Sequence, residues 1–488
     1  MNPDPPEMRM CMASRPSGSV STDYIQIGPA HWASALHRGL WGQSSTDRGC
    51  GMGSLGSASI VDGPVVWAVY AVAALLALCL LLVRPNRGWL RGRWVTVAVV
   101  SMLVGAGAGL LLTWFTDDLL NLFGVDFSFV TRAWIAVSVA GVALGFCSVV
   151  AGRLRRKLLG IVGVLVFLAT GAMSINIDIG TYPTLQSLAG VSPYDTSTLP
   201  ALGRATTLPM PLEASWVPPS NLPAAGSISS VRIPGTVSGF DARDGLVYLP
   251  PAALVANPPV LPVVIALSGQ PGAPADPLVS GHLAESLDAF AKAHHGLAPI
   301  VVSPDQLGAP ENNPMCVDGA LGNAATYLTV DVVAWITAHL PVADPPDQWA
   351  IAGFSEGGTC AVQLGAEHPE LFGALLDISG ELVPTNGSTV QETIDSGFAG
   401  SLAAYTAAQP LTILKEHTPY AGSFAVFAVG ENDAEFRTTA LEVSAAAKAA
   451  GMTTTFFEAP GSAHDYTTAT YAFARGVALL SSHWGLAT

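Results

Sequence analysis

Four long apolar runs near the start of this chain limit what it can fold into more than any other feature. They cover residues 65–83, 94–115, 134–151 and 158–175, and each is almost free of charged side chains. Each has close to the roughly 20 residues that an α-helix needs to cross the hydrocarbon of a bilayer. Helices of a soluble core normally keep a polar face, which these runs lack. The sequence therefore predicts four transmembrane helices and a lipid bilayer as a partner.

Charged residues in the short loops between these runs predict how the helices are oriented. The first and third loops are basic and the second is acidic: Arg84, Arg87, Arg91 and Arg93; Arg153, Arg155, Arg156 and Lys157; Asp117, Asp118 and Asp126. Loops rich in arginine and lysine stay on the cytoplasmic side. We therefore expect a multi-pass protein of the cell membrane with both termini, and the large C-terminal domain, outside the cytoplasm.

The remaining sequence divides by composition. Residues 1–61 are rich in Gly, Ser, Met and Pro and predict a disordered tail, although Met52 is an alternative start. Residues 62–176 hold the four helices, and residues 177–226, with repeated Pro, Ser and Thr, predict a linker. Residues 227–488 form the last region. Its acidic side chains greatly outnumber its basic ones, and the whole chain has a net charge of −15, so nucleic acid is excluded as a partner.

The last region alternates between strand-like and helix-like segments. An antiparallel hairpin is expected first, from residues 231–234 and 246–251. Six apolar runs follow and helical segments such as 284–294 and 440–450 separate them; the runs are 263–267, 299–303, 350–354, 374–378, 424–429 and 454–458. Apolar runs of this length suit a sheet buried on both faces. The pattern predicts an α/β domain with a mostly parallel sheet.

One strand-like run ends in the sequence Gly353-Phe354-Ser355-Glu356-Gly357. In the G-x-S-x-G pattern a serine occupies a strained turn between a strand and a helix, where the small residues on either side allow the two elements to approach. The sequence predicts Ser355 as a nucleophile. A glycine-rich turn without chemistry is the alternative.

A serine hydroxyl needs a base and an acid that orients the base. His464 follows the last predicted strand and is the expected base. Asp433, after the strand at 424–429, is the expected acid, with Glu431 as the alternative; Asp433 could instead cap the following helix. The oxyanion that forms on attack needs two backbone N–H donors. We assign these to Glu356 and, because Pro271 has no N–H, to Gln270.

Cysteines and motifs add two further expectations. Cys316 and Cys360 are the only cysteines in the domain placed outside, where disulfides persist, so we expect them to be bonded. No histidine or cysteine cluster has the spacing of a metal site, and no glycine-rich phosphate loop follows a strand. Neither a metal nor a cofactor is therefore expected.

The residues Trp349–Gly358, together with His368-Pro369-Glu370-Leu371-Phe372 and Ile378-Ser379-Gly380, resemble the esterase family of α/β-hydrolases that includes esterase D (S-formylglutathione hydrolase) and the antigen 85 mycolyltransferases. The resemblance covers about residues 227–485, and with the four helices the chain is similar to membrane-anchored esterase-family proteins of actinobacteria. It implies an α/β-hydrolase fold, with Ser355, His464, Gln270 and Glu356 in the family's roles. The mycolyltransferases use a glutamate as the acid where this chain offers Asp433, and it lacks their arginine and acidic residues after the oxyanion loop, so trehalose binding is not implied.

The expected function is that of a membrane-anchored extracytoplasmic serine esterase or acyltransferase, acting on an acyl ester through an acyl-enzyme. The substrate could be a cell-envelope lipid or glycolipid. Two alternatives stay open, a serine peptidase with the same triad and a non-catalytic envelope-binding module on an α/β-hydrolase scaffold.

Overall fold

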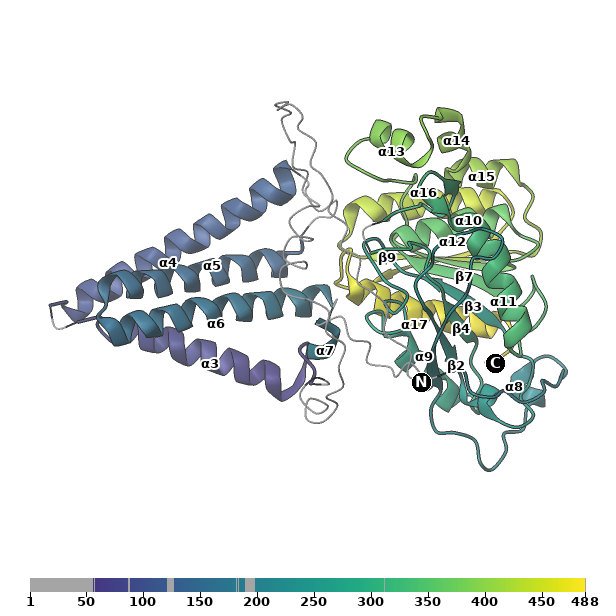
Figure 1. The fold of residues 1–488 in the computed structure, drawn as a ribbon, viewed down its shortest axis with the longest axis horizontal. Helices are drawn as coiled ribbons and strands as arrows, with labels where there is room; N and C mark the ends of the chain where they lie inside the picture. Colours follow the sequence, from purple (N-terminus) through teal and green to yellow (C-terminus); the bar gives the residue numbers. More distant parts are fainter. Residues whose placement is uncertain are drawn as a thin grey trace, which may run out of the picture. The chain divides into compact units, whose positions relative to one another are not determined.

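The structure, a computed structural model, describes Gly56 and residues 58–487 except 87, 121–126, 181, 183, 189–197 and 311. Most of the expected disordered tail, and the loop residues Arg87 and Asp126, lie outside the described residues. The described chain consists of a group of long helices followed by an α/β domain (Figure 1).

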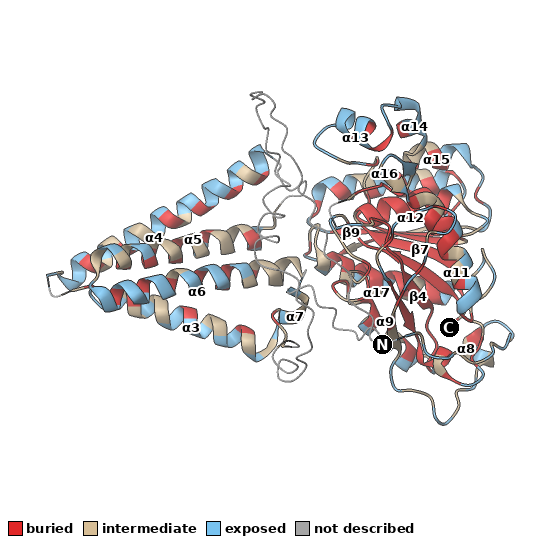
Figure 2. Ribbon diagram, in the orientation of Figure 1, coloured by how far each residue is buried: buried red, intermediate tan, exposed pale blue. Residues whose placement is uncertain are grey.

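Each of the four apolar runs forms a helix, as predicted. They are α3 (Gly63–Leu82), α4 (Arg91–Thr113, continued by the π-helical turn η1, Trp114–Leu119), α5 (Phe129–Ala151) and α6 (Leu154–Ile179). All four are long and apolar enough to cross a membrane. Much of their surface is exposed (Figure 2), including large apolar side chains such as Leu75 and Leu103, which are 68% and 67% exposed. Helix α6 extends three residues beyond the expected boundary at 176.

Small residues set the spacing between these helices. A Cβ atom added to Gly109 of α4 would lie 2.9 Å from the Cα atom of Ala136 in α5. Likewise, a Cβ atom added to Gly160 of α6 would lie 2.7 Å from the carbonyl oxygen of Gly145 in α5. Such close backbone approach is how helices associate where water does not drive apolar surfaces together.

The α/β domain is built on an eight-stranded sheet with the strand order β1-β2-β4-β3-β7-β8-β9-β10. Its strands are β1 (Ser227–Val231), β2 (Gly245–Leu249), β3 (Val263–Leu267), β4 (Ile300–Ser303), β7 (Trp349–Phe354), β8 (Ala374–Ile378), β9 (Phe424–Gly430) and β10 (Thr453–Ala459). Strand β2 is antiparallel to both β1 and β4, and all other neighbours are parallel. The predicted hairpin and mostly parallel sheet are confirmed.

The sheet is covered on both faces by helices, and its central strands are buried (Figure 2). One apolar cluster joins the sheet to α9 (Leu283–Ala293) and α17 (Tyr466–His483). The other joins it to α11 (Val332–His339), α12 (Glu356–Glu367), α15 (Pro410–Glu416) and α16 (Ala434–Ala449). Burial on both faces explains why the strands are continuous apolar runs without alternation.

Shorter elements fill the connections. They are α7 (Leu185–Leu188), α8 (Leu212–Ser215), η2 (Pro251–Leu254), β5 (Asp318–Gly319), β6 (Gly322–Asn323), α10 (Ala324–Thr326), η3 (Tyr327–Asp331), α13 (Val390–Gly397) and α14 (Leu402–Ala407). Leu212 is buried in the core and Trp216 packs against it, so the last part of the expected linker packs on the domain. Helices α13 to α15 lie in the segment between β8 and β9 (Figure 1).

Candidate active site

Ser355 lies on the turn between β7 and α12, with φ of 58° and ψ of −120°. This left-handed conformation is rare for a residue with a side chain and marks a strained site. A Cβ atom on Gly353 would lie 2.1 Å from the carbonyl oxygen of Gly357, and one on Gly357 would lie 2.4 Å from the carbonyl oxygen of Ser268. The two glycines therefore allow the strand, the helix and the loop after β3 to meet at the serine.

The structure brings Ser355, His464 and Asp433 together in one hydrogen-bonded line. His464 Nε2 lies 2.9 Å from Ser355 Oγ, and His464 Nδ1 lies 3.0 Å from Asp433 Oδ2. The carboxylate can only accept, so Nδ1 carries the proton and Nε2 is free to accept the serine hydroxyl proton. The three residues come from the ends of β7, β9 and β10, which share one edge of the parallel sheet.

His464 is held in place by its neighbours. Its ring centroid lies 3.9 Å from that of Phe436 and 5.0 Å from that of Phe354. The side chains of His464 and Asp433 are only 8% and 6% exposed. Packing and burial thus fix the ring and keep water from replacing the carboxylate.

Asp433 serves two purposes with its two oxygens. Oδ2 contacts His464, while Oδ1 accepts a hydrogen bond of 3.4 Å from the N–H of Phe436 at the start of α16. Helix capping and orientation of the imidazole, weighed as alternatives from the sequence, occur together. The alternative acid, Glu431, instead accepts a hydrogen bond of 2.7 Å from the N–H of Gly461 and braces the loop before His464.

The loop after β3, which contains the predicted oxyanion donor Gln270, lies against the nucleophile. A Cβ atom added to Gly269 would be 3.4 Å from Ser355 Cβ. Gln306 Nε2 donates to the Ser268 carbonyl oxygen at 2.7 Å. Arg243 Nη2 donates to the Gly272 carbonyl oxygen at 3.0 Å, and polar contacts therefore fix both ends of this loop.

Sequence reasoning did not identify Gln306 and Arg243, the two side chains that hold this loop. Arg243 forms an ion pair with the buried Asp305 at 2.7 Å, which orients its guanidinium. Asp305 and Gln306 follow Pro304 just past the end of β4, the neighbour of β3 in the sheet. Polar residues just past the carboxyl end of a buried parallel strand were the signal that could have found them.

Near the turn that carries Ser355, Cys316 and Cys360 are joined by a disulfide, which ties the segment before β5 to α12. Among the residues that the structure describes, the group of possible metal ligands is Cys316, Glu356 and Cys360. The bonded sulfurs are not thiolates, the form that binds metals. Burial raises the pKa of Glu356 to about 8 and that of Asp377, at the end of β8, to about 7.

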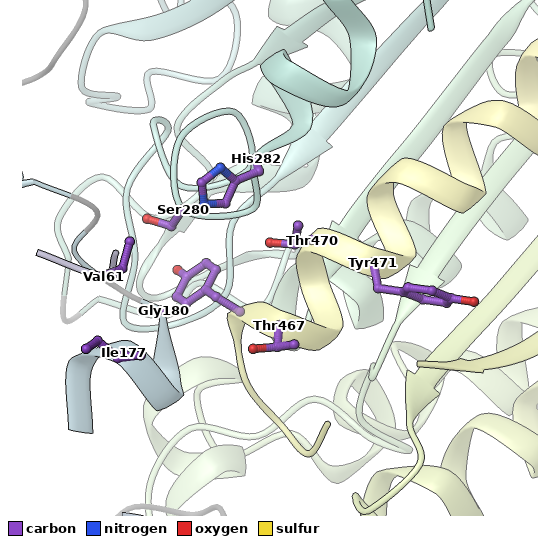
Figure 3. A pocket seen from close by; sticks show the side chains of 9 residues that line it. Val61, Ile177, Gly180, Ser280, His282, Thr467, Thr470 and Tyr471 are labelled. Atoms are coloured by element: carbon purple, nitrogen blue, oxygen red, sulfur yellow. The ribbon is translucent and has the colours of Figure 1, made fainter. Parts of the chain in front are cut away.

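A separate hollow involves other parts of the α/β domain. Ser280 and His282, before α9, and Thr467 and Thr470, in α17, contribute to its lining (Figure 3). The lining contains none of the residues of the hydrogen-bonded line at Ser355.

Comparison with known proteins shows the family to which the α/β domain belongs. Residues 241–474 match the profile of the Esterase family, described as "Putative esterase". An uncharacterized protein of Corynebacterium glutamicum is 35% identical over 309 residues, which are 62% of this chain and 71% of that protein.

Solved structures are similar at lower identity. A ferulic acid esterase is 18% identical with a TM-score of 0.44, covering 54% of this chain and 100% of that one. The S-formylglutathione hydrolase of Agrobacterium tumefaciens is also 18% identical, with a TM-score of 0.43 and coverage of 54% and 97%. MPT51 of Mycobacterium tuberculosis is 17% identical, with a TM-score of 0.39 and coverage of 53% and 99%. By its family match and its curated relative, this chain belongs to the esterase family of α/β-hydrolases, serine hydrolases that act on carboxylic esters.

Proposed function

We propose that this protein is a membrane-anchored serine esterase or acyltransferase that works through an acyl-enzyme on Ser355. The observation that carries the proposal is the hydrogen-bonded line from Ser355 through His464 to Asp433. In this scheme Ser355 Oγ attacks the ester carbonyl while His464 Nε2 takes its proton. Asp433 stabilises the imidazolium that results.

The rest of the cycle follows from the same groups. The backbone N–H groups of Glu356 and Gln270 stabilise the oxyanion of the tetrahedral intermediate. When that intermediate collapses, His464 returns the proton to the leaving alcohol, and Ser355 keeps the acyl group. Water or an acceptor hydroxyl then attacks the acyl carbonyl while His464 takes its proton, and when the second tetrahedral intermediate collapses His464 returns this proton to Ser355 Oγ as the acid or the new ester leaves. Hydrolysis and transfer differ only in this second nucleophile.

A fluorophosphonate probe tests the nucleophile and the base. The full chain, purified in detergent, should be labelled, whereas Ser355→Ala and His464→Ala should not, provided that both variants keep the wild-type circular dichroism spectrum. A folded wild type that does not react would favour the non-catalytic binding module. Cleavage of peptides but not of esters would favour the serine peptidase.

The location of the domain is part of the proposal. Arg84, Arg91 and Arg93 lie between α3 and α4 or in the first turn of α4, and Arg153 and Lys157 lie at the start of α6. Asp117 and Asp118 lie at the opposite end of α4. This charge pattern supports a cytoplasmic side for the basic ends and an outer position for the α/β domain, where the disulfide would persist. Protease added to intact cells should digest the domain; protection until the membrane is opened would reverse the orientation.

The proposed substrate is an acyl ester of a cell-envelope lipid or glycolipid, because a membrane-anchored domain outside the cytoplasm works next to such molecules. Purified protein would be given short-chain and long-chain acyl esters, with and without sugar acceptors. Acyl sugars among the products would indicate transfer, and free acid alone would indicate hydrolysis. Activity on short, water-soluble esters only would argue against a lipid substrate.

A further inference from the structure

The side chain of Glu356, the residue after the nucleophile, is buried next to the reaction centre. It is 4% exposed. Its Oε2 lies 3.3 Å from Gln306 Nε2, and its Oε1 lies 3.0 Å from Cys360 Sγ and 3.7 Å from Cys316 Sγ. The groups that contact its two oxygens are thus an amide and two sulfur atoms, and none of them is a cation. A buried carboxylate in such surroundings lacks the compensation that a charge requires.

The contact with sulfur favours the protonated carboxyl. Cys316 and Cys360 are bonded to each other, so neither sulfur carries a hydrogen. A hydrogen bond between Oε1 and Cys360 Sγ is therefore possible only if the Glu356 O–H donates and the sulfur accepts. Oε2 remains to accept from Gln306. A neutral acid satisfies both contacts, whereas a carboxylate satisfies only one.

Gln306 links this carboxyl to the other half of the oxyanion hole. The amide orientation is fixed because the Ser268 carbonyl oxygen can only accept, and Nε2 lies 2.7 Å from it. The same nitrogen lies 3.1 Å from Ser268 Oγ and 3.3 Å from Glu356 Oε2. One fully buried amide thus bridges the loop that leads to Gln270 and the first residue of α12. These two segments carry both proposed oxyanion donors.

We propose that Glu356 acts as a neutral carboxylic acid which, together with Gln306, positions the two halves of the oxyanion hole, and that loss of its proton impairs catalysis at alkaline pH. Both side chains are positioning residues, since the donors themselves are backbone N–H groups. The inference rests on the proposed function of Ser355 as a nucleophile.

Burial, one hydrogen bond and one neighbouring charge set the pKa of Glu356, and the two that raise it outweigh the one that lowers it. Burial raises the pKa of Glu356 to about 8, the Gln306 hydrogen bond lowers it, and the negative charge of Glu381, after β8, raises it. Asp377, at the end of β8, is another buried acid whose pKa burial raises, so it supplies no positive charge that could stabilise a Glu356 carboxylate. On the β4 side, the positive charge of Arg243 is bound to Asp305. Above about pH 8 a carboxylate would therefore form close to the developing oxyanion and oppose it.

The pH dependence of acylation tests the inference. With the full chain in detergent, the rate of fluorophosphonate labelling in wild type should fall roughly tenfold or more between pH 7.5 and pH 9.5. In Glu356→Gln, which keeps the backbone N–H and the side-chain shape, the profile normalised to its own maximum should lack this fall. A flat wild-type profile, or a fall that persists in Glu356→Gln, would overturn the inference.

Variants at two neighbouring residues should shift the pH of the alkaline fall in labelling rate in opposite directions. Glu381→Gln removes a nearby negative charge, so the alkaline fall should move to lower pH. Gln306→Leu removes a hydrogen bond that favours the carboxylate, so the fall should move to higher pH, while the maximal rate decreases because the oxyanion loop loses its support. A purely structural role for Gln306 would lower the rate without moving the fall.

A measurement that does not depend on activity separates this inference from the proposed function. In Ser355→Ala, infrared difference spectroscopy should show the carbonyl stretch of a protonated carboxylic acid that disappears as the pH rises through 8, and the band should be missing from Ser355→Ala/Glu356→Gln. If labelling of wild type fails but the band titrates, the proposed function is wrong and Glu356 is still a neutral acid. If labelling succeeds and the band is absent at pH 7, only the inference is wrong.

Discussion

Replacing Asp433 by asparagine tests the orienting acid at a site where size and shape stay the same. The amide oxygen of asparagine can still accept from the N–H of Phe436, so α16 should keep its cap. The carboxylate that accepts from His464 Nδ1 at 3.0 Å is lost, however, and an amide N–H facing this nitrogen favours the tautomer with the proton on Nε2. That tautomer cannot accept the proton of Ser355.

The size of the effect follows from burial. The two side chains are 8% and 6% exposed, so water cannot replace the lost carboxylate or stabilise the imidazolium. We expect kcat/KM to fall by about 10³- to 10⁴-fold, as in other serine hydrolase triads, which corresponds to about 4–5.5 kcal/mol of transition-state stabilisation. The melting temperature should change little, because the helix cap and the packing of Phe436 remain.

The assay is hydrolysis of a chromogenic short-chain ester by wild type and both acid variants. Glu431→Gln is the matched control, because its amide oxygen can still accept from the N–H of Gly461; its kcat/KM should stay within a few-fold of wild type. If Asp433→Asn keeps wild-type activity, or if Glu431→Gln loses it instead, the assignment of the acid is wrong.

Three further predictions concern stability. Replacing both Cys316 and Cys360 by serine opens a 44-residue loop, and chain entropy predicts a loss of about 4 kcal/mol of unfolding free energy, measured by denaturant titration; an unchanged midpoint would contradict it. Asp331 accepts hydrogen bonds from the N–H and the Oγ hydroxyl of Ser238 at 3.0 and 2.6 Å. Asp331→Ala should therefore lower the free energy of unfolding by on the order of 2–4 kcal/mol, measured in the same way. A loss under about 0.5 kcal/mol would show that these hydrogen bonds contribute little to stability. The pKa of Glu356 is raised from 4.5 to about 8, so the stability its neutral form contributes is full below pH 4.5 and is lost as the pH rises to 8. The free energy of unfolding of Glu356→Gln, relative to that of wild type, should therefore rise over this range by at most about 1.4 kcal/mol per pKa unit. If thermal unfolding shows that this difference between the two proteins does not change with pH, Glu356 is not a buried neutral acid.

The parts of the fold that the sequence predicted well are those whose pattern is local. Strands β3 and β8 begin and end where their apolar runs do, because a strand buried on both faces is marked by every one of its residues. The first strand was displaced: the sequence favoured 231–234, and the structure has Ser227–Val231. Pro234 has no N–H to donate to a neighbouring strand, so the strand could not continue through it as expected.

The site was predictable to the extent that topology brings strand ends together. Ser355, Asp433 and His464 each follow a strand, and parallel strands place such residues at one edge. The bridge through Gln306 and the ion pair of Arg243 with Asp305 could not be derived in the same way. The place of Asp305 and Gln306 just past β4 could have marked them as candidates, but their partners depend on how loops from non-adjacent parts of the chain pack against each other, and no spacing in the sequence encodes that packing.

The most direct test of the account is to find where the acyl group rests during turnover. The full chain would be mixed with an ester whose acyl-enzyme hydrolyses slowly, quenched in acid, digested and analysed by mass spectrometry. The account predicts one acyl adduct, on the peptide that contains Ser355, and none in Ser355→Ala. Turnover of the ester without that adduct, or with the acyl group on another residue, would contradict it.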